Sequence, residues 1–188
     1  LLRQQLLQCR GTLAELSHTA ELSAAGERQQ RPADRFVRGC VERWSARRPR
    51  VSCRVACIGS GSAPLVAFDQ TLPQALENLL NNAADTGSES VEVTLDWDPQ
   101  EVRIAVRDRG PGAPAALLAR MGDSHNTSAA AGYATATTPT AGVQGGLGIG
   151  LVLARATAER HGGRLALQNA EGGGCIATLH LPAGGDDA

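Results

Sequence analysis

Three asparagines, Asn78, Asn81 and Asn82, lie within five residues of a segment that is otherwise mostly apolar. Asparagine is a poor helix former, so this cluster would weaken a helix unless its side chains are used. Asn78, Asn82 and Asp85 are spaced i, i+4 and i+7 and would share one stripe of that helix. Amide oxygens on such a stripe suit a hard cation such as Mg²⁺, and the amide NH₂ groups suit phosphate. The alternative is a polar outer helix face, and this cluster alone leaves both interpretations open.

The segment Asp108-Arg109-Gly110-Pro111-Gly112 directly follows an alternating apolar run. Gly110 and Gly112 permit a tight turn in which the backbone can approach a flat ligand. The carboxylate of Asp108, at the end of a strand, could accept a hydrogen bond from an exocyclic amine. Asp-x-Gly-x-Gly is also a common turn, so this motif is a weak signal when it stands alone.

Residues 145–151, Gly-Gly-Leu-Gly-Ile-Gly-Leu, open a predicted helix. Glycines at alternate positions expose backbone N–H groups at the positive end of the helix dipole, an arrangement that suits a phosphate chain. A dinucleotide-binding fold would instead need Gly-x-Gly-x-x-Gly after a first strand, with an acid about 20 residues later. The spacing here is Gly-x-Gly-x-Gly, which argues against that fold.

Together and in this order, the three segments resemble the N, G1 and G2 boxes of the histidine-kinase branch of the GHKL ATPases. Relatives of that branch include gyrase, the ATP-binding heat-shock chaperones and the mismatch-repair ATPases. The resemblance covers about residues 34–182. It implies that a nucleotide lies under a lid, between the helix that carries the asparagines and the glycine-rich helix.

By this resemblance Asn82 is the principal Mg²⁺ ligand, Asn78 is its companion, and Asp108 binds the adenine amine of ATP. Gly110 and Gly112 would shape the base pocket. The other ligand-binding residues that the resemblance implies are Asp85, Gly146, Leu147, Gly148 and Gly150. The ending of the last helix, residues 159–164, also looks like the family's usual helix exit, which makes His161 structural rather than catalytic.

The reaction that the resemblance implies is transfer of the γ-phosphate of ATP to a histidine, mostly by positioning and charge stabilisation. In hydrolytic relatives a glutamate four residues before the Mg²⁺ asparagine activates water, and Asn78 occupies that position here. Its presence favours transfer over hydrolysis, although Glu77 is adjacent. The sequence departs from the family's usual pattern in two ways. Asp85 stands where many such kinases have Lys or Arg, and the aromatic lid motif of many members is missing. The alternatives are a nucleotide-binding regulatory or scaffold module and a GHKL ATPase.

His18 is followed by Thr-Ala-Glu and lacks the family's His-Glu-Leu-x-Thr-Pro type of acceptor motif, so it is expected on the surface of a leading helix. The phosphoacceptor histidine is therefore expected outside this chain, which starts without Met and looks like a piece of a longer protein. Residues 1–10 resemble the segment around the redox-active cysteine of RegB/PrrB-type sensor kinases, which makes Cys9 a redox candidate. The Asn-Ala-Ala-Asp sequence at 82–85 fits that subfamily too.

Composition excludes several other classes of protein. The net charge of −1 over 188 residues argues against strong nonspecific attraction to nucleic acid. All 18 basic side chains are Arg, which excludes a Walker-A loop and a Schiff-base lysine. Nine Arg between Arg28 and Arg54 mostly alternate with apolar positions and favour a solvated helix face, with a phosphate-binding or partner surface as the alternative. Five cysteines without CxxC spacing argue against a zinc site and a disulfide framework, and indicate a reducing compartment.

The elements that must position these segments show two periods. Alternation predicts strands near residues 51–57, 65–68, 91–95, 102–106, 165–167 and 176–181. Helical periodicity predicts helices at about 1–25, 34–48, 71–85, 114–121 and 147–161. Asp34 and Asp69 are the expected N-caps, and residues 98–100 the turn of a hairpin. The expected fold class is α/β, a two-layer sandwich with helices on one face of a largely antiparallel sheet. By resemblance it is the Bergerat or GHKL ATP-binding fold, preceded by one long helix of a dimerisation hairpin.

The expected organisation is a dimerisation-helix remnant at 1–25, a linker at 26–33, a catalytic ATP-binding domain at 34–182 and a tail at 183–188, with a lid at about 122–145. No apolar run approaches the roughly 18 residues of a membrane span. The fragment is therefore expected in the cytoplasm. The resemblance implies that the full-length protein is a homodimer anchored in the inner membrane. The expected partners are ATP, the protein's own phosphoacceptor helix and a response regulator, and not a nucleic acid.

Overall fold

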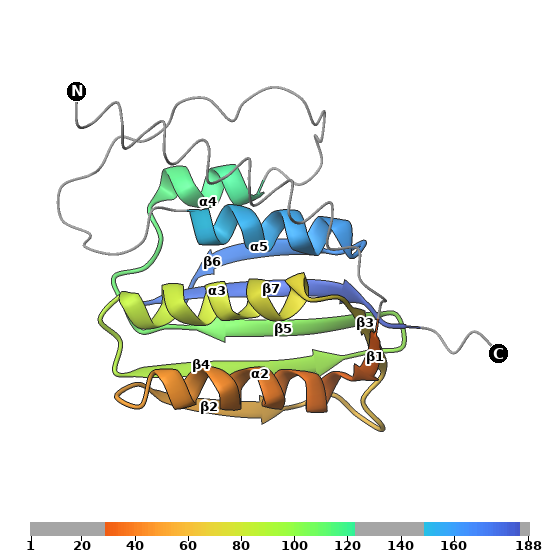
Figure 1. The fold of residues 1–188 in the computed structure, drawn as a ribbon. Helices are drawn as coiled ribbons and strands as arrows, with labels where there is room; N and C mark the ends of the chain where they lie inside the picture. The colour runs from red at the N-terminus through yellow and green to blue at the C-terminus, as the bar shows by residue number, and fades with distance from the viewer. Residues whose placement is uncertain (1–28, 123–148, 185–188) are drawn as a thin grey trace, which may run out of the picture.

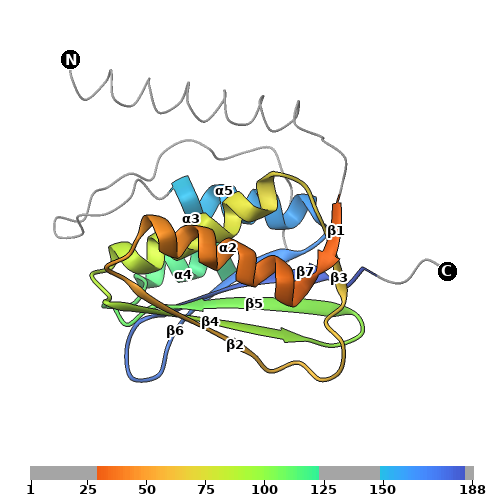
Figure 2. The same ribbon diagram turned by 60° about the horizontal axis from the view of Figure 1, so that its bottom comes forward.

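The computed structural model describes residues 29–122 and 149–184, which form a two-layer α/β sandwich (Figure 1). The main sheet has five strands in the order β2-β4-β5-β7-β6. These strands are β2 (Ser52–Cys57), β4 (Ser90–Trp97), β5 (Glu101–Arg107), β7 (Cys175–Pro182) and β6 (Arg164–Asn169). One face of the sheet is covered by the helices α2 (Ala33–Arg47), α3 (Thr71–Asp85) and α5 (Ile149–Arg160), as Figure 2 shows. The predicted sandwich, with its helices on one face, is confirmed.

The register of the main sheet follows the alternation of apolar residues. Strands β4 and β5 form the expected hairpin, in which Leu95 pairs with Ile104, and both side chains are fully buried. Asp98 closes the turn because its Oδ1 accepts hydrogen bonds from the backbone N–H groups of Gln100 and Glu101, both at 2.9 Å. The pair β2–β4 is parallel, and the pairs β4–β5, β5–β7 and β6–β7 are antiparallel.

A second sheet consists of two antiparallel strands, β1 (Gln29–Pro32) and β3 (Leu65–Phe68). The sequence predicted a linker at 26–33, but residues 29–32 of that segment form a strand. The sequence Gln-Gln-Arg-Pro shows no apolar alternation, and backbone groups make the pairing, so side-chain periodicity does not reveal this strand. The other end of the described domain joins β3 as well, because the N–H of Gly184 donates to the carbonyl of Leu65 at 2.8 Å.

Helix α2 begins at Ala33, with Pro32 as its N-cap and without a side-chain capping bond. The prediction of Asp34 as the N-cap is wrong, because Pro32, at φ −52°, ends β1 and leads directly into the helix. Asp34 lies in the first turn, where a carboxylate suits the positive end of the helix dipole. The buried side chains are those that the spacing predicts, together with Ala33: Phe36, Val37, Cys40, Val41 and Trp44.

Helix α3 begins at Thr71, and Gln70, the residue at the N-cap position, makes no side-chain capping bond. The prediction of Asp69 as the N-cap is one residue off, but Asp69 still bonds to the first turn, since its Oδ1 accepts hydrogen bonds from the backbone N–H of Thr71 at 2.8 Å and from the Thr71 hydroxyl. The buried face of α3 consists of Leu72, Ala75, Leu76, Leu79, Leu80, Ala83 and Ala84. The polar residues between them are therefore left on the two flanks of the helix.

The last helix ends in the predicted pair of glycines. Helix α5 ends at Arg160, and Gly162 has a φ of +75°, the left-handed conformation that often terminates helices. A Cβ on Gly163 would lie 1.9 Å from the carbonyl oxygen of His180, so only glycine allows the chain to approach β7 this closely at the start of β6. The short helix α4 (Ala115–Gly122) lies one residue later than its predicted range, 114–121.

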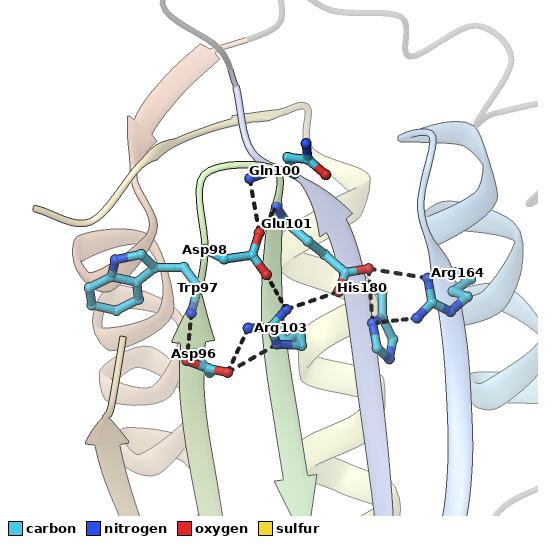
Figure 3. Close-up of polar contacts among 8 residues, drawn as sticks. All are labelled: Asp96, Trp97, Asp98, Gln100, Glu101, Arg103, Arg164 and His180. Atoms are coloured by element: carbon cyan, nitrogen blue, oxygen red, sulfur yellow. Dashed lines mark hydrogen bonds and ion pairs between the residues drawn. The ribbon is translucent and has the colours of Figure 1, made fainter. Parts of the chain in front are cut away.

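A polar cluster links four strands of the main sheet near the turn of the hairpin (Figure 3). Its members are Asp96, Asp98, Glu101, Arg103, Arg164 and His180. Arg103 contacts all three acids, with its Nη1 2.6 Å from Asp98 and its Nη2 2.7 Å from Asp96. Burial raises the pKa of Glu101, but hydrogen bonds from His180 and Arg103 lower it more, so this pKa lies below its ordinary value. The cluster lies at the start of β5, whereas the candidate site described below follows the end of β5.

Several expectations concern residues outside 29–122 and 149–184. They are the leading helix at 1–25, nearly all of the loop at 122–145 and residues 185–188 of the tail. No helix in the two described ranges is long and apolar enough to cross a lipid bilayer.

Candidate functional site

Two polar flanks run along α3, one on each side of its buried face. Asn78 and Asn82 face the start of α5, because a Cβ on Gly150 would lie 3.5 Å from the Cβ of Asn78 and from both amide atoms of Asn82. Glu77 and Asn81 instead contact side chains of α2. Successive helix residues differ by about 100° in rotation, so a change of one position moves a side chain from one flank to the other. The structure therefore brings Asn78, Asn82 and Gly150 together, as the sequence predicts.

The side-chain amide of Asn82 lacks a hydrogen-bond partner on its donor side. Its Nδ2 is buried, and no acceptor is found for it in the described part of the chain. Buried polar groups are almost always hydrogen-bonded, and an unpaired one destabilises a fold by about 1–3 kcal/mol. Gly150 brings no side chain to this place, so the amide faces the backbone at the start of α5.

Asp108 directly follows β5, and its side chain is buried. Its backbone N–H donates to the carbonyl of Cys175 on β7 at 3.0 Å, which keeps the residue in line with the sheet. The N–H of Gly110 donates to Oδ1 of Asp108 at 2.7 Å, so the turn folds back onto the carboxylate. The second oxygen, Oδ2, accepts no hydrogen bond from any described residue and can accept one from a ligand.

Gly110 packs against the residue that follows α3. A Cβ on Gly110 would lie 2.6 Å from the Cβ of Thr86, so a larger residue would push the turn and the helix apart. The Thr86 hydroxyl donates to the carbonyl of Ala83 at 2.8 Å and lies 3.0 Å from the hydroxyl of Ser88. The Ser88 oxygen accepts the backbone N–H of Arg109 at 2.9 Å. The end of α3 and the turn after β5 therefore form one connected unit.

Asn169, at the end of β6, holds the segment between this turn and α4. Its Oδ1 accepts the backbone N–H of Ala113 at 2.7 Å, and its Nδ2 donates to the carbonyl of the same residue at 3.1 Å. Gly112, directly before Ala113, has a φ of +85°, which favours glycine, and a Cβ there would lie 3.0 Å from the Asn169 oxygen. Both predicted glycines of the turn, Gly110 and Gly112, are thus required by close contacts.

Cys175 lies beside Asp108 and is a packing residue. Burial, and to a smaller extent the negative charge of Asp108, raise the pKa of its thiol to about 11. The thiol is therefore protonated at neutral pH. Its neighbour Gly174 is also required by a close contact, since a Cβ there would lie 2.0 Å from the carbonyl oxygen of Asp108.

Two acids near the asparagines are engaged elsewhere. Asp85 pairs with Arg48 at 3.0 Å, and Glu77 pairs with Arg47 at 2.7 Å, in both cases on the side of α2. The sequence predicted that Asn78, Asn82 and Asp85 share one stripe of the helix. In the structure Asn78 and Asn82 lie beside Gly150, whereas Asp85 bonds to Arg48 at the end of α2. The predicted residues Gly146, Leu147, Gly148 and Cys9 lie outside the described ranges.

The residues that the sequence analysis missed are Asn169, Thr86 and Ser88. Each acts through a partner that is distant in sequence or through a backbone group, and local periodicity shows neither. A usable signal for Asn169 is its position as a polar residue at the end of an apolar strand, because such residues often bond to a neighbouring loop.

The site offers neutral oxygen donors for a cation. The amide oxygens of Asn78 and Asn82 are hard ligands of the type that Mg²⁺ prefers. Across residues 29–122 and 149–184, no group of three or more His, Cys, Asp or Glu residues could hold a metal ion. Mg²⁺ commonly takes only one or two ligands from a protein and the rest from phosphates and water. The donor set therefore fits a cation that binds together with a phosphorylated ligand.

Comparison with known proteins gives a consistent result. Residues 69–185 match the family of histidine kinase-, DNA gyrase B- and HSP90-like ATPases. The sensor histidine kinase GtrS of Pseudomonas aeruginosa is 32% identical over 129 residues, 69% of this chain and 24% of that protein. The sensor histidine kinase RegB of Cereibacter sphaeroides is 27% identical over 172 residues, 90% of this chain and 36% of that protein. The chain thus spans well under half the length of these curated relatives.

The same fold occurs in a solved structure, the nucleotide-free catalytic domain of the histidine kinase ThkA. The likeness covers 84% of this chain and 98% of that chain, with a TM-score of 0.63 and 20% sequence identity. At this identity the likeness shows the fold, which is the two-layer α/β sandwich described above.

Proposed function

The chain belongs to the family of histidine kinase-, DNA gyrase B- and HSP90-like ATPases, and we propose that it supplies the γ-phosphate for a protein-histidine kinase reaction. Within that family it corresponds to the catalytic ATP-binding domain of sensor histidine kinases. The observation that carries the proposal is the unpartnered amide of Asn82, which faces Gly150 between α3 and α5. A phosphate oxygen is the acceptor that this buried donor lacks.

We assign the base of ATP to the turn after β5. Oδ2 of Asp108 accepts the exocyclic amine of adenine, while Oδ1 remains bonded to the N–H of Gly110. The contact of Gly110 with Thr86, and of Gly112 with Asn169, keeps this turn narrow enough for a flat ring. The pocket is thus preorganised by bonds that exist before the nucleotide arrives.

The phosphates are assigned to the start of α5 and the facing flank of α3. Backbone N–H groups at Gly146, Leu147, Gly148 and Gly150 meet the phosphate oxygens, helped by the positive end of the helix dipole. Asn82 donates from Nδ2 to a phosphate oxygen, and Asn78 stands beside it. Asp85 is bonded to Arg48, so we assign it to the contact with α2 rather than to the ligand.

The amide oxygens of Asn82 and Asn78 would hold Mg²⁺ together with the phosphates. The cation would neutralise charge that develops on the phosphate oxygens during transfer. The described residues of the chain have one further role in this proposal. They orient the nucleotide beside the antiparallel helices α3 and α5 and leave its γ-phosphate available to an incoming imidazole.

Transfer to histidine is favoured over hydrolysis. The position of the water-activating glutamate of hydrolytic relatives is occupied by Asn78, whose amide is not a general base. The adjacent Glu77 is on the other flank of α3 and is paired with Arg47 at 2.7 Å. It is therefore not directed toward the phosphates, and we do not propose a chaperone-type ATPase.

The partners of the proposed reaction lie outside this chain. The acceptor histidine is on the protein's own dimerisation helix, in a homodimer, and the phosphoryl group passes on to a response regulator. We further propose that the domain works in the cytoplasm and that the full-length protein is anchored in the inner membrane. The resemblance to RegB-type kinases makes redox state the candidate input, with Cys9 as the sensing residue.

Two measurements on the 188-residue chain test this function. Calorimetric titration with ATP should give micromolar to sub-millimolar affinity that requires Mg²⁺. With γ-labelled ATP, a separately supplied dimerisation domain should acquire acid-labile label, while this chain remains unlabelled. Release of labelled phosphate without transfer would indicate an ATPase, and nucleotide binding with neither outcome would indicate a regulatory module. Absence of binding would overturn the proposal.

A further inference from the structure

A partly buried hydrogen bond connects α2 to the flank of α3 that faces away from the nucleotide site. Trp44, in the last turn of α2, is 1% exposed, and its indole Nε1 donates to Oδ1 of Asn81 at 2.9 Å. The two residues are 37 positions apart in sequence. A buried indole N–H needs an acceptor, and Asn81 supplies it.

Ion pairs lie on both sides of this bond. Glu77, Asn81 and Asp85 are spaced i, i+4 and i+8 along α3, and the two acids pair with Arg47 and Arg48 of the α2 end. Both pairs are substantially exposed, and exposed pairs are screened by water and contribute little. The bond from Trp44 is therefore the polar contact between α2 and α3 that water screens least, and it acts together with the apolar face of α3 in orienting the helix.

The rotation of α3 decides where Asn82 points. Asn81 and Asn82 are adjacent but lie on different flanks, so one rotation moves both amides. With side chains about 5–6 Å from the helix axis, a rotation of about 10° displaces an amide by about 1 Å. A misplacement of about 1 Å in a reacting site can lower its efficiency by about a hundredfold.

We propose that Asn81 is a positioning residue of the nucleotide site: by accepting the indole N–H of Trp44, it holds α3 in the rotation that directs Asn78 and Asn82 toward Gly150. The proposal rests on the proposed function, since it requires ATP to bind between α3 and α5. It also explains why a third asparagine occurs in this helix. Asn81 touches neither the nucleotide nor the reacting atoms and acts only through the helix.

The test measures the affinity of the 188-residue chain for a ribose-labelled fluorescent ATP analogue with Mg²⁺, together with the melting temperature of each variant. Asn81→Leu leaves the indole without an acceptor, and we expect affinity to fall about tenfold, equivalent to about 1.4 kcal/mol. Asn81→Asp retains the accepting oxygen for the indole N–H. We expect its affinity to stay within about twofold of the wild type.

The double variant Trp44→Phe/Asn81→Leu separates positioning from simple stability. Removing donor and acceptor together leaves no unpaired buried group, so the melting temperature should recover toward that of the wild type. Affinity should remain as low as in Asn81→Leu, because the contact that sets the rotation is still absent. If Asn81→Leu does not fold, Trp44→Phe alone removes the same bond from the other side and should also weaken binding.

Two results would overturn the positioning role. One is wild-type affinity in Asn81→Leu or Trp44→Phe, and the other is an affinity that follows the melting temperature across all variants. A wild-type chain that does not bind the analogue would instead overturn the proposed function, and this inference with it. Failure of the two proposals is therefore distinguishable.

Discussion

Nε2 of His161 lies 3.3 Å from Oδ1 of Asp69, so the exit of α5 is bonded to the start of α3. Both side chains are largely buried, at 5% and 11% exposed. Arg160 adds a second bond between the same ends, since it donates to the hydroxyl of Thr71 at 2.7 Å. The two helices that carry the proposed site are therefore joined at the ends opposite to Asn82 and Gly150. This is a structural role for His161, as the resemblance of its segment implies.

The first prediction concerns pH. Burial raises the pKa of Asp69, but hydrogen bonds from Thr71 and His161 lower it more, so the pKa is lower in the folded than in the unfolded chain. The resulting stabilisation is fully present above the unfolded-state pKa of about 4 and is lost as the pH falls through the folded-state pKa. Asp69→Asn should therefore lower the melting temperature at about pH 7, and the difference from the wild type should shrink by about pH 3. A difference that is constant across this pH range would contradict the assignment.

The second prediction concerns the base. Asp108→Asn keeps an oxygen for the N–H of Gly110, but it can present an NH₂ group where adenine also presents one. We expect ATP affinity to fall by about two orders of magnitude or more, while circular dichroism shows an unchanged fold. Discrimination against GTP should weaken at the same time, since guanine has a carbonyl at the equivalent position. Unchanged ATP affinity would remove Asp108 from the base pocket.

The third prediction is that one substitution maintains or raises the stability of the fold and lowers the affinity for ATP. Asn82→Ala removes a buried amide donor that has no partner in the described structure, and alanine is the better helix former. The ligand-free chain should therefore melt at the same or a higher temperature, by up to about 1 kcal/mol in free energy of unfolding. ATP affinity should nevertheless fall at least about tenfold, because a charge-assisted bond to phosphate is lost. A variant that loses stability and keeps its affinity would show that Asn82 is a structural residue.

The fourth prediction tests the clamp at the end of β6. Asn169→Ala removes both hydrogen bonds to the backbone of Ala113. The segment between the base turn and α4 loses its anchor, so we expect the KM for ATP to rise several-fold while kcat changes little. The matched control is Gln168→Ala, an exposed neighbour on the same strand whose side chain makes no hydrogen bond to any residue in the described ranges. Equal effects of the two substitutions would deny Asn169 a positioning role.

The fifth prediction concerns redox control. Burial raises the pKa of Cys53 and of Cys175 to about 11, and burial also raises the pKa of Cys40, so these thiols are poor targets for oxidation at neutral pH. We expect Cys9→Ala to abolish inhibition by oxidant in a protein that includes the acceptor helix. Cys57→Ala is the control, and its redox response should match that of the wild type. Equal inhibition of wild type and Cys9→Ala would remove Cys9 from the mechanism.

Much of the fold follows from short-range patterns that are visible in the sequence. One face of β4 is buried, so its apolar residues alternate along the sequence, as Val91, Val93 and Leu95 do. This alternation predicts the strand, its buried face and its pairing with β5 in a hairpin. At Gly110 the sequence predicted a tight turn in which the backbone can approach a flat ligand. The structure adds a contact that the sequence does not show, since Gly110 packs against the side chain of Thr86.

Contacts between distant segments could not be predicted in this way. Nothing around Trp44 indicates that its indole bonds to Asn81, because the acceptor is 37 residues away. Strand β2 pairs with β4 in parallel, and alternation alone gives neither this pairing nor the strand order. Asp85 illustrates the same limit, since helical spacing placed it beside Asn78, and the charge of Arg48 bonds it to α2 instead.

Strand β1 is joined to the rest of the domain through a single antiparallel pair with β3, and three of its four residues are exposed. Opening this pair uncovers little apolar surface, so it requires much less free energy than opening the five-stranded sheet. A pull at Gln29 should therefore open the pair of β1 with β3 before it opens any strand of the five-stranded sheet. Because β1 leads directly into α2 at Ala33, opening this pair exposes the first turn of that helix next.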